Sequence, residues 1–259
     1  MKGAIIGDYV GSAFEHVGNK AAMNFDLIQS HSRFTDDTIL TIATADAILN
    51  KLSYEESYFK WGSKFPRAGY SKTFMDWLCS SYKKPYNSFG NGSAMRVSPI
   101  SWLYDSLDEV LIEAKKSAEV THNHPEGIKG AQAVASAIFL ARKYVTKDEI
   151  KLYVEQNFNY DLSISCEEII AQGYTFDLTC QGSVPQAIRC FLDSESYEQS
   201  IRNAVHLNGD TDTQAAIAGS IAEAFYGLNS FTFKEEILDK LAPELKAVLL
   251  QFETKLLNK

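Results

Sequence analysis

The chain has 259 residues, of which 45% are hydrophobic, and its formal net charge at pH 7 is −8. A chain of this size and apolar content buries one sizeable core, so we expect a single domain over residues 1–259. The negative charge disfavours nucleic acids and anionic membranes, which bind basic surfaces, and an anionic ligand would have to be held by backbone N–H groups, helix N-termini or metal ions.

Cysteine usage and the N-terminal segment indicate a cytoplasmic protein. The four cysteines are widely spaced, form no C-x-x-C pair and are expected to be buried reduced thiols: Cys79, Cys166, Cys180 and Cys190. Asp8 interrupts the apolar run Ala4–Ile6 before it could become a signal h-region or a membrane span. We therefore expect a monomer without membrane contact.

The first predicted helix, residues 3–14, carries glycines on one face. Gly3, Gly7 and Gly11 are spaced four apart, which places them where another backbone can approach closely. Because the segment is too short to span a membrane, we expect this face to pack inside the core. Asp8 and Glu15 share roughly one side of the helix. By its spacing alone, Glu15 is more typical of a solvated carboxylate than of a catalytic one.

A polar, irregular stretch from His16 to Ser32 follows, and such loops often gate a site. Thr35-Asp36-Asp37-Thr38 then precedes a segment with Ile39 and Ile42 on one helical face. The position of these carboxylates and hydroxyls predicts an acidic helix N-terminus.

Residues 53–82 carry aromatic side chains at helical spacing, a pattern more typical of a core than of a ligand platform. A predicted loop over 83–92 leads into a short helix near Met95. Its sequence Gly90-Asn91-Gly92-Ser93 lacks the third glycine and the preceding strand of a dinucleotide-binding loop. Such a loop can still offer N–H groups to phosphate or ribose. Arg96 is equally well explained as a structural partner for a carboxylate, and we leave it out of the site.

The central part of the chain is predicted to be helical and offers few chemical groups. Pro125 suits the first turn of a long helix over 125–144, with Asn123 or His124 as its cap. Residues 145–173 are predicted to form amphipathic helices and a loop. Tyr174 and Phe176 follow, and each suits core packing as well as stacking on a base.

A second acidic stretch, Gly209-Asp210-Thr211-Asp212-Thr213, precedes an Ala-rich helix predicted over Gln214–Gly227. This helix is suited to close packing against the first one. Asn208 stands before the stretch and tolerates positive φ better than other non-glycine residues, so a tight turn is expected there. Residues 233–257 are predicted to form one or two amphipathic helices.

The two acidic stretches together point to a metal site. One alone is explained by helix capping and by Asp in the first turn, whose favourable interaction with the helix dipole is worth about 0.3–1 kcal/mol. Four carboxylates brought together repel one another, and a cation is the usual remedy. With oxygen ligands only, the ion is hard: Mg²⁺, Mn²⁺ or Ca²⁺. Ala215 and Ile221 stand where an EF-hand needs Gly and Glu, which favours a paired-helix site instead.

Four motifs, in the same order, resemble those of the ADP-ribosylglycohydrolase family, which includes the dinitrogenase reductase-activating glycohydrolase and the ADP-ribosylarginine and ADP-ribosylserine hydrolases. They are Thr35-Asp36-Asp37-Thr38, Gly90-Asn91-Gly92-Ser93-Ala94-Met95-Arg96, Thr121-His122 and Gly209-Asp210-Thr211-Asp212-Thr213. The resemblance implies an all-α fold, a compact single-domain orthogonal helical bundle. One departure is Asn208, where the family commonly has a glycine.

The resemblance also implies roles for individual residues. Two Mg²⁺ or Mn²⁺ ions would be held by Thr35, Asp36, Asp37, Asp210, Asp212 and Thr213. Glu15 would be the catalytic acid/base beside them. ADP-ribose would be bound by Gly92, Ser93, Met95, His122, Tyr174 and Phe176, with the last two beneath the nucleotide.

The function that the resemblance implies is metal-dependent hydrolysis of the bond between ADP-ribose and a protein side chain of the arginine or serine type, reversing mono-ADP-ribosylation. The alternatives are a catalytically silent ADP-ribose-binding or structural protein of the same fold, a hydrolase of another ADP-ribose derivative, a Ca²⁺-stabilised scaffold, and a metallohydrolase of phosphate esters. The intact acidic motifs argue against a silent protein, and the absence of His ligands argues against the last. The motifs would contact only the ADP-ribose half of the substrate, so they do not indicate which linkage is cleaved.

Overall fold

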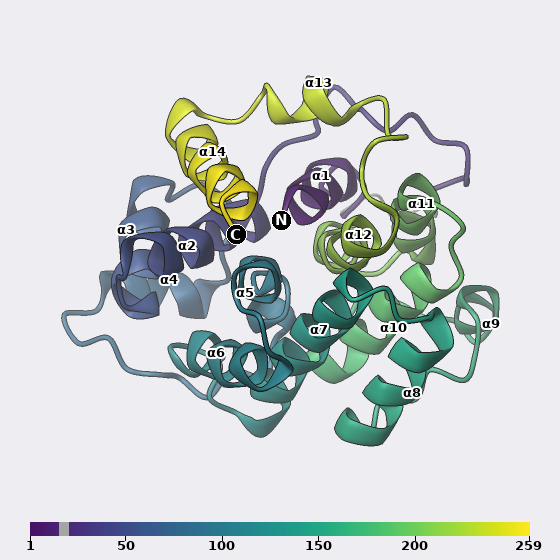
Figure 1. Ribbon diagram of the computed structural model, residues 1–259, viewed down its shortest axis with the longest axis horizontal. Helices are drawn as coiled ribbons and strands as arrows, with labels where there is room; N and C mark the ends of the chain where they lie inside the picture. The colour runs from purple at the N-terminus through teal and green to yellow at the C-terminus, as the bar shows by residue number, and fades with distance from the viewer. Residues whose placement is uncertain (16–20) are drawn as a thin grey trace.

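The computed structural model describes residues 1–15 and 21–259, and within these ranges every named element is helical (Figure 1). The expected all-α fold is thereby confirmed. In chain order the elements are α1 (Lys2–Gly11), α2 (Asp36–Asn50), α3 (Tyr54–Lys64), α4 (Lys72–Cys79), the 3₁₀ turn η1 (Asn91–Ser93), α5 (Ser98–Leu103), α6 (Leu107–Glu119), α7 (Pro125–Arg142), α8 (Lys147–Phe158), α9 (Cys166–Ala171), α10 (Cys180–Leu192), α11 (Tyr197–Leu207), α12 (Thr211–Tyr226), α13 (Lys234–Leu238) and α14 (Pro243–Leu257).

Helices α1 and α12 pack side by side at the centre of the molecule, as Figure 1 shows. Their backbones approach at the predicted glycine face: a Cβ built on Gly7 would lie 2.1 Å from the carbonyl oxygen of Ala215, and one on Gly11 would lie 2.3 Å from that of Thr211. The expected close packing of these two helices is thus confirmed. It places the end of α1 beside the start of α12.

Gly7→Ala is expected to destabilise the protein by about 2 kcal/mol, because a methyl group has no room against the α12 backbone. Alanine at an unconstrained helical position would instead stabilise by about 1 kcal/mol, so the sign of the change reports the close packing. Urea unfolding of both proteins measures it, with Gly173→Asn as the control, since nothing lies within 4 Å of a Cβ at Gly173 and Asn tolerates its positive φ. A Gly7→Ala variant as stable as the wild type would contradict the packing.

Both acidic stretches begin helices, as expected. Thr35 is the N-cap of α2, and its side chain accepts a hydrogen bond from the Asp37 N–H at 3.3 Å. Asp210 is the N-cap of α12. The turn before it is made by Asn208, whose φ of 64° confirms the expected left-handed conformation. Since α2 and α12 both contact α1, the two helix starts lie close together.

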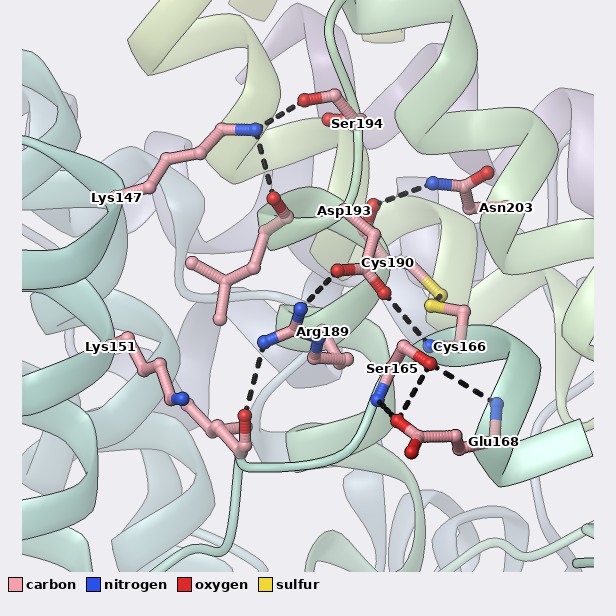
Figure 2. A network of polar contacts seen from close by, with 12 residues as sticks. Lys147, Lys151, Ser165, Cys166, Glu168, Arg189, Cys190, Asp193, Ser194 and Asn203 are labelled. Carbon is pink, nitrogen blue, oxygen red and sulfur yellow. Dashed lines mark hydrogen bonds and ion pairs between the residues drawn. The ribbon is translucent and has the colours of Figure 1, made fainter.

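A polar network holds α8, α9 and α10 together, and Figure 2 shows it. Lys147 donates to the carbonyl oxygens of Leu192 and Ser194 at the end of α10. Arg189 donates to the Asp193 carboxylate, which also accepts from the backbone N–H of Cys166 at 2.8 Å. The network anchors α9 on α10, the two helices that flank the segment carrying Tyr174 and Phe176.

Several local expectations were met and others were wrong. His124 caps α7, since its Nδ1 accepts from the Glu126 N–H at 3.1 Å, and Pro125 is the first helical residue. Cys79 is exposed, because it ends α4 at the surface, whereas the other three cysteines are buried and free as predicted. Helix α10 begins at Cys180, where the Thr179 side chain caps it.

Part of the expected gating loop, His16–Ser32, lies outside the described residues, namely 16–20. Residues 21–32 of this loop follow an irregular path. Arg202 holds them on α11 by donating to the carbonyl oxygens of Met23 and Phe25. Among the described residues, no helix is both long enough and apolar enough to cross a membrane.

Candidate functional site

A cleft of about 690 Å³ opens above the adjoining starts of α2 and α12. Its floor contains the carboxylates of both acidic stretches and of Glu15. Its walls come from the loop before η1, the start of α4 and the segment 176–179. The cleft therefore joins parts of the chain that are far apart in sequence.

The carboxylates at the floor, together with Asp8 beneath it, form two groups that share Asp212. In one group, oxygen atoms of Asp8, Asp37 and Asp212 all lie within 4.8 Å of one another, and in the other the same holds for Glu15, Asp210 and Asp212. Asp37, Asp210 and Asp212 are buried, whereas Glu15 is partly exposed. Two adjoining oxygen-rich sites with one common carboxylate thus lie at the base of the cleft.

The electrostatics of this cluster favour a cation. Burial, and next the charge of Asp212, raise the pKa values of Asp36, Asp37 and Asp210 well above their usual range. The Oδ1 atom of Asp37 is buried and has no hydrogen-bond partner among the described residues. A hard divalent ion bound among these carboxylates would offset their mutual repulsion and would coordinate the oxygen atom that lacks a hydrogen bond.

Two hydroxyl groups border the same carboxylates. Thr213 donates from Oγ1 to Asp37 Oδ2 at 3.2 Å, and Thr35 Oγ1 lies 3.4 Å from that oxygen. Together with Asp36, which lines the cleft, all six residues predicted as metal ligands gather at the floor. The donor set fits the expected Mg²⁺ or Mn²⁺, since it contains oxygen atoms only.

Four of the six residues predicted to bind substrate line the cleft, namely Gly92, Met95, His122 and Phe176. The other two turn away from it. Ser93 is fully buried and donates to the carbonyl oxygen of Gly127 at 2.7 Å. The Tyr174 hydroxyl donates to the carbonyl oxygen of Gly182 at 2.9 Å and accepts from Gln214 at 2.7 Å. Of the two aromatic residues, Phe176, which is 45% exposed, is therefore the one placed to meet a base.

The His122 imidazole is held as a neutral hydrogen-bond donor. Burial, and next the charge of Arg96, lower its pKa well below the usual value. Arg96 donates to Thr121 Oγ1 at 2.9 Å, and this hydroxyl lies 2.7 Å from His122 Nδ1, to which it can donate its proton. The tautomer assigned from this chain of contacts carries its proton on Nε2, on the side facing Gly92.

Sequence reasoning missed three residues of this site. Arg96 is fully buried and lies 4.2 Å over the Tyr58 ring, and its contacts are to Thr121 and a carbonyl oxygen instead of the expected carboxylate. Asn91 donates from Nδ2 to Asp210 Oδ2 at 2.6 Å. Asp8 joins the acidic cluster from α1. Only the position of Asp8, on the side of the helix that leads to Glu15, was a signal in the sequence.

Comparisons with known proteins find similar proteins over most of the chain. A family model described as ADP-ribosylglycohydrolase matches residues 1–259. The chain is similar to ADP-ribosylhydrolase ARH3 of Mus musculus, with 27% identity over 88% of this chain and 83% of that protein. It is also similar to ADP-ribosylarginine hydrolase Tri1 of Pseudomonas putida, with 24% identity over 95% and 76% of the two proteins. A solved structure described as an ADP-ribosylglycohydrolase-related protein complex shares the fold, with a TM-score of 0.74 at 22% identity, over 98% of this chain and 96% of the other.

Proposed function

The chain belongs to the ADP-ribosylglycohydrolase family, and on this premise we propose that it hydrolyses the glycosidic bond between ADP-ribose and a modified protein side chain of the arginine or serine type. The observation that carries the proposal is the grouping of Glu15 with Asp210 and Asp212 at the floor of the cleft. Relatives named as an ADP-ribosylhydrolase and an ADP-ribosylarginine hydrolase support the reaction class.

We propose that the reaction depends on two divalent ions, Mg²⁺ or Mn²⁺, held by the six predicted ligands. These are Thr35, Asp36, Asp37, Asp210, Asp212 and Thr213. The chemistry that such ions supply when bound is Lewis acidity toward the ribose hydroxyls and toward an attacking water. Coordination keeps the aspartates ionised and occupies their lone pairs, so none of them is suited to act as the base as well.

Glu15 is the acid/base in this proposal. Cleavage of the bond passes through an oxocarbenium-like state, which requires a proton for the leaving group and the removal of a proton from water. Glu15 lines the cleft at the end of the segment after α1 and is more exposed than Asp37, Asp210 and Asp212. It is therefore the carboxylate of the cluster placed to exchange protons with substrate and water.

The rest of the cleft suits the ADP-ribose half of the substrate. Gly92 lies at η1 with no side chain between its backbone and the cleft, and His122 Nε2–H faces it as a neutral donor. Backbone N–H groups and neutral donors bind a diphosphate without the charge repulsion that a carboxylate would cause. Phe176 supplies an aromatic face for adenine.

Metal binding is expected to strengthen with pH. The raised pKa values of Asp36 and Asp37 mean that the metal-free fold holds protons that the unfolded chain has lost. These protons contribute stability to the metal-free fold. The contribution is complete below the pKa of an aspartate in the unfolded chain, about 4, and is lost as the pH rises through the pKa values of the folded state. Because the ions need ionised carboxylates, the increase in Tm caused by Mn²⁺ should grow as the pH rises above about 4, with proton release on binding.

Thermal unfolding with Mn²⁺ and with EDTA at each pH measures this effect, and calorimetry in buffers of different ionisation enthalpy counts the protons. An increase in Tm that is independent of pH, without proton release, would show that the cluster is already ionised in the metal-free protein.

The proposed function is tested by the release of free ADP-ribose from mono-ADP-ribosylated arginine and serine peptides, with Mg²⁺, Mn²⁺ or EDTA. Metal-dependent release from one peptide supports the proposal and identifies the linkage. If neither peptide is cleaved although Mn²⁺ and ADP-ribose bind, the chain is a silent ADP-ribose-binding protein or acts on another ADP-ribose derivative. Small O-linked ADP-ribose esters and ADP-ribosylated nucleic acid then separate those two possibilities.

A further inference from the structure

Asp8 is a fully buried carboxylate that accepts four hydrogen bonds from the start of α2. Its Oδ1 accepts from Thr35 Oγ1 at 2.7 Å, and its Oδ2 accepts from the backbone N–H groups of Thr35 at 2.9 Å and Thr38 at 3.1 Å. The Thr38 hydroxyl donates to Oδ2 as well. A carboxylate oxygen offers about two lone-pair sites, so Oδ2 is fully used, while Oδ1 holds the Thr35 hydroxyl.

These contacts distinguish Asp8 from Asp37, its neighbour in the same group of oxygen atoms. Asp37 has an Oδ1 atom that is buried and, among the described residues, has no hydrogen-bond partner. Asp8 is instead bonded to the start of α2 through both of its oxygens. Asp8 is therefore fixed on Thr35 before any ion binds.

The contacts of Asp8 determine how the Thr35 hydroxyl is oriented. Its single proton is directed to Asp8 Oδ1 at 2.7 Å, and one of its lone pairs accepts from the Asp37 N–H at 3.3 Å. The 3.4 Å separation between Thr35 Oγ1 and Asp37 Oδ2 therefore brings together two oxygen atoms without a proton between them. Two oxygens that both present lone pairs at this distance suit two ligands of one cation.

We propose that Asp8 is a positioning residue for the metal centre: it turns the Thr35 hydroxyl so that a lone pair faces the ion. The inference rests on the proposed function in that it takes the acidic cluster to be a metal site. Outer partners that orient metal ligands typically contribute about 10–100-fold to metal affinity.

The test is Mn²⁺ binding by calorimetry, without substrate, to the wild type, Asp8→Asn, Thr35→Val and the double variant. Asp8→Asn is expected to weaken binding about 10–100-fold. In the Thr35→Val background the same change should weaken it clearly less, because the hydroxyl that Asp8 orients is already gone. Wild-type affinity in Asp8→Asn, or losses that add fully in the double variant, would overturn the proposal.

Asp46→Asn is the matched control. Asp46 is also a buried aspartate, lies on α2 and accepts from Asn50, Lys60 and Trp61. Its replacement removes a comparable set of hydrogen bonds at the other end of the helix, so it should lower Tm without changing Mn²⁺ affinity. Equal weakening of Mn²⁺ binding in both variants would make Asp8 a purely structural residue and overturn the proposal.

If Asp8→Asn does not fold, Thr35→Val and Thr38→Val answer the same question. Both threonines donate to Asp8, but only Thr35 also borders Asp37. Mn²⁺ binding at least about tenfold weaker in Thr35→Val than in Thr38→Val supports the orientation of Thr35, and equal affinities contradict it. A wild type that binds no Mn²⁺ overturns this inference and the metal dependence together, whereas one that binds Mn²⁺ but releases no ADP-ribose contradicts the proposed function alone.

Discussion

Asp212→Asn is expected to lower the release of ADP-ribose by at least about 10³-fold, the scale seen when one member of a catalytic unit is removed. Asp212 is the carboxylate common to both groups of oxygen atoms, so its replacement weakens both metal sites at once. The asparagine keeps the size of the side chain, and Mn²⁺ binding should be lost together with turnover.

The stability of the metal-free variant provides a second readout. The charge of Asp212 raises the pKa values of Asp36, Asp37 and Asp210, after the effect of burial, which means that it repels them. Removing it should leave the Tm in EDTA at pH 8 unchanged or higher, while the increase in Tm caused by Mn²⁺ disappears. Asp161→Asn, a change at an exposed surface position, is the control and should behave as the wild type. A strongly destabilised Asp212→Asn in EDTA would mean that Asp212 holds the fold instead of a cation.

Glu15→Gln is expected to lower kcat by about 10²–10⁴-fold, the contribution usual for a positioned general acid or base. The glutamine side chain has nearly the same size as that of glutamate but cannot exchange a proton. Since the other carboxylates of its group remain, Mn²⁺ affinity and ADP-ribose affinity should change by less than tenfold. The measurements are kcat and KM with the cleaved peptide, and calorimetry with Mn²⁺ and with ADP-ribose.

The outcome separates two roles for Glu15. A loss of turnover with both affinities retained supports the acid/base role. A loss of turnover that follows an equal loss of Mn²⁺ binding would make Glu15 a metal ligand, which its grouping with Asp210 and Asp212 also allows. If kcat is unchanged in Glu15→Gln, another group at the cleft is the acid/base.

Local structure was predicted well from the sequence because it depends on neighbouring residues. The capping residue Thr35, the left-handed turn at Asn208 and the first-turn Pro125 each follow from interactions within a few positions of the chain. The glycine face of α1 and its packing on α12 followed from helical periodicity combined with side-chain size. The oxygen-only donor set likewise needed no more than the residue types of the two acidic stretches.

Only the tertiary structure decided where individual side chains point. The side chains of Ser93 and Tyr174 do not enter the cleft, because their hydroxyls donate to the carbonyl oxygens of Gly127 and Gly182, whereas substrate binding by the Ser93 backbone stays a prediction. Whether a side chain enters a cleft or turns into the core depends on which distant segment offers it a partner, and spacing along one helix does not report that partner.

The supporting residues of the site show the same limit. Asp8 and Asn91 were missed because each acts on a residue in another part of the chain, Asp8 on Thr35 and Asn91 on Asp210. The sequence by itself thus determined the helix starts and the chemistry of the candidate ligands, since these follow from local and periodic interactions, and the resemblance of its motifs to a known family implied the all-α fold. The contacts that orient those ligands are formed between residues up to 176 positions apart, and only the packing of the helices brings them within hydrogen-bonding distance.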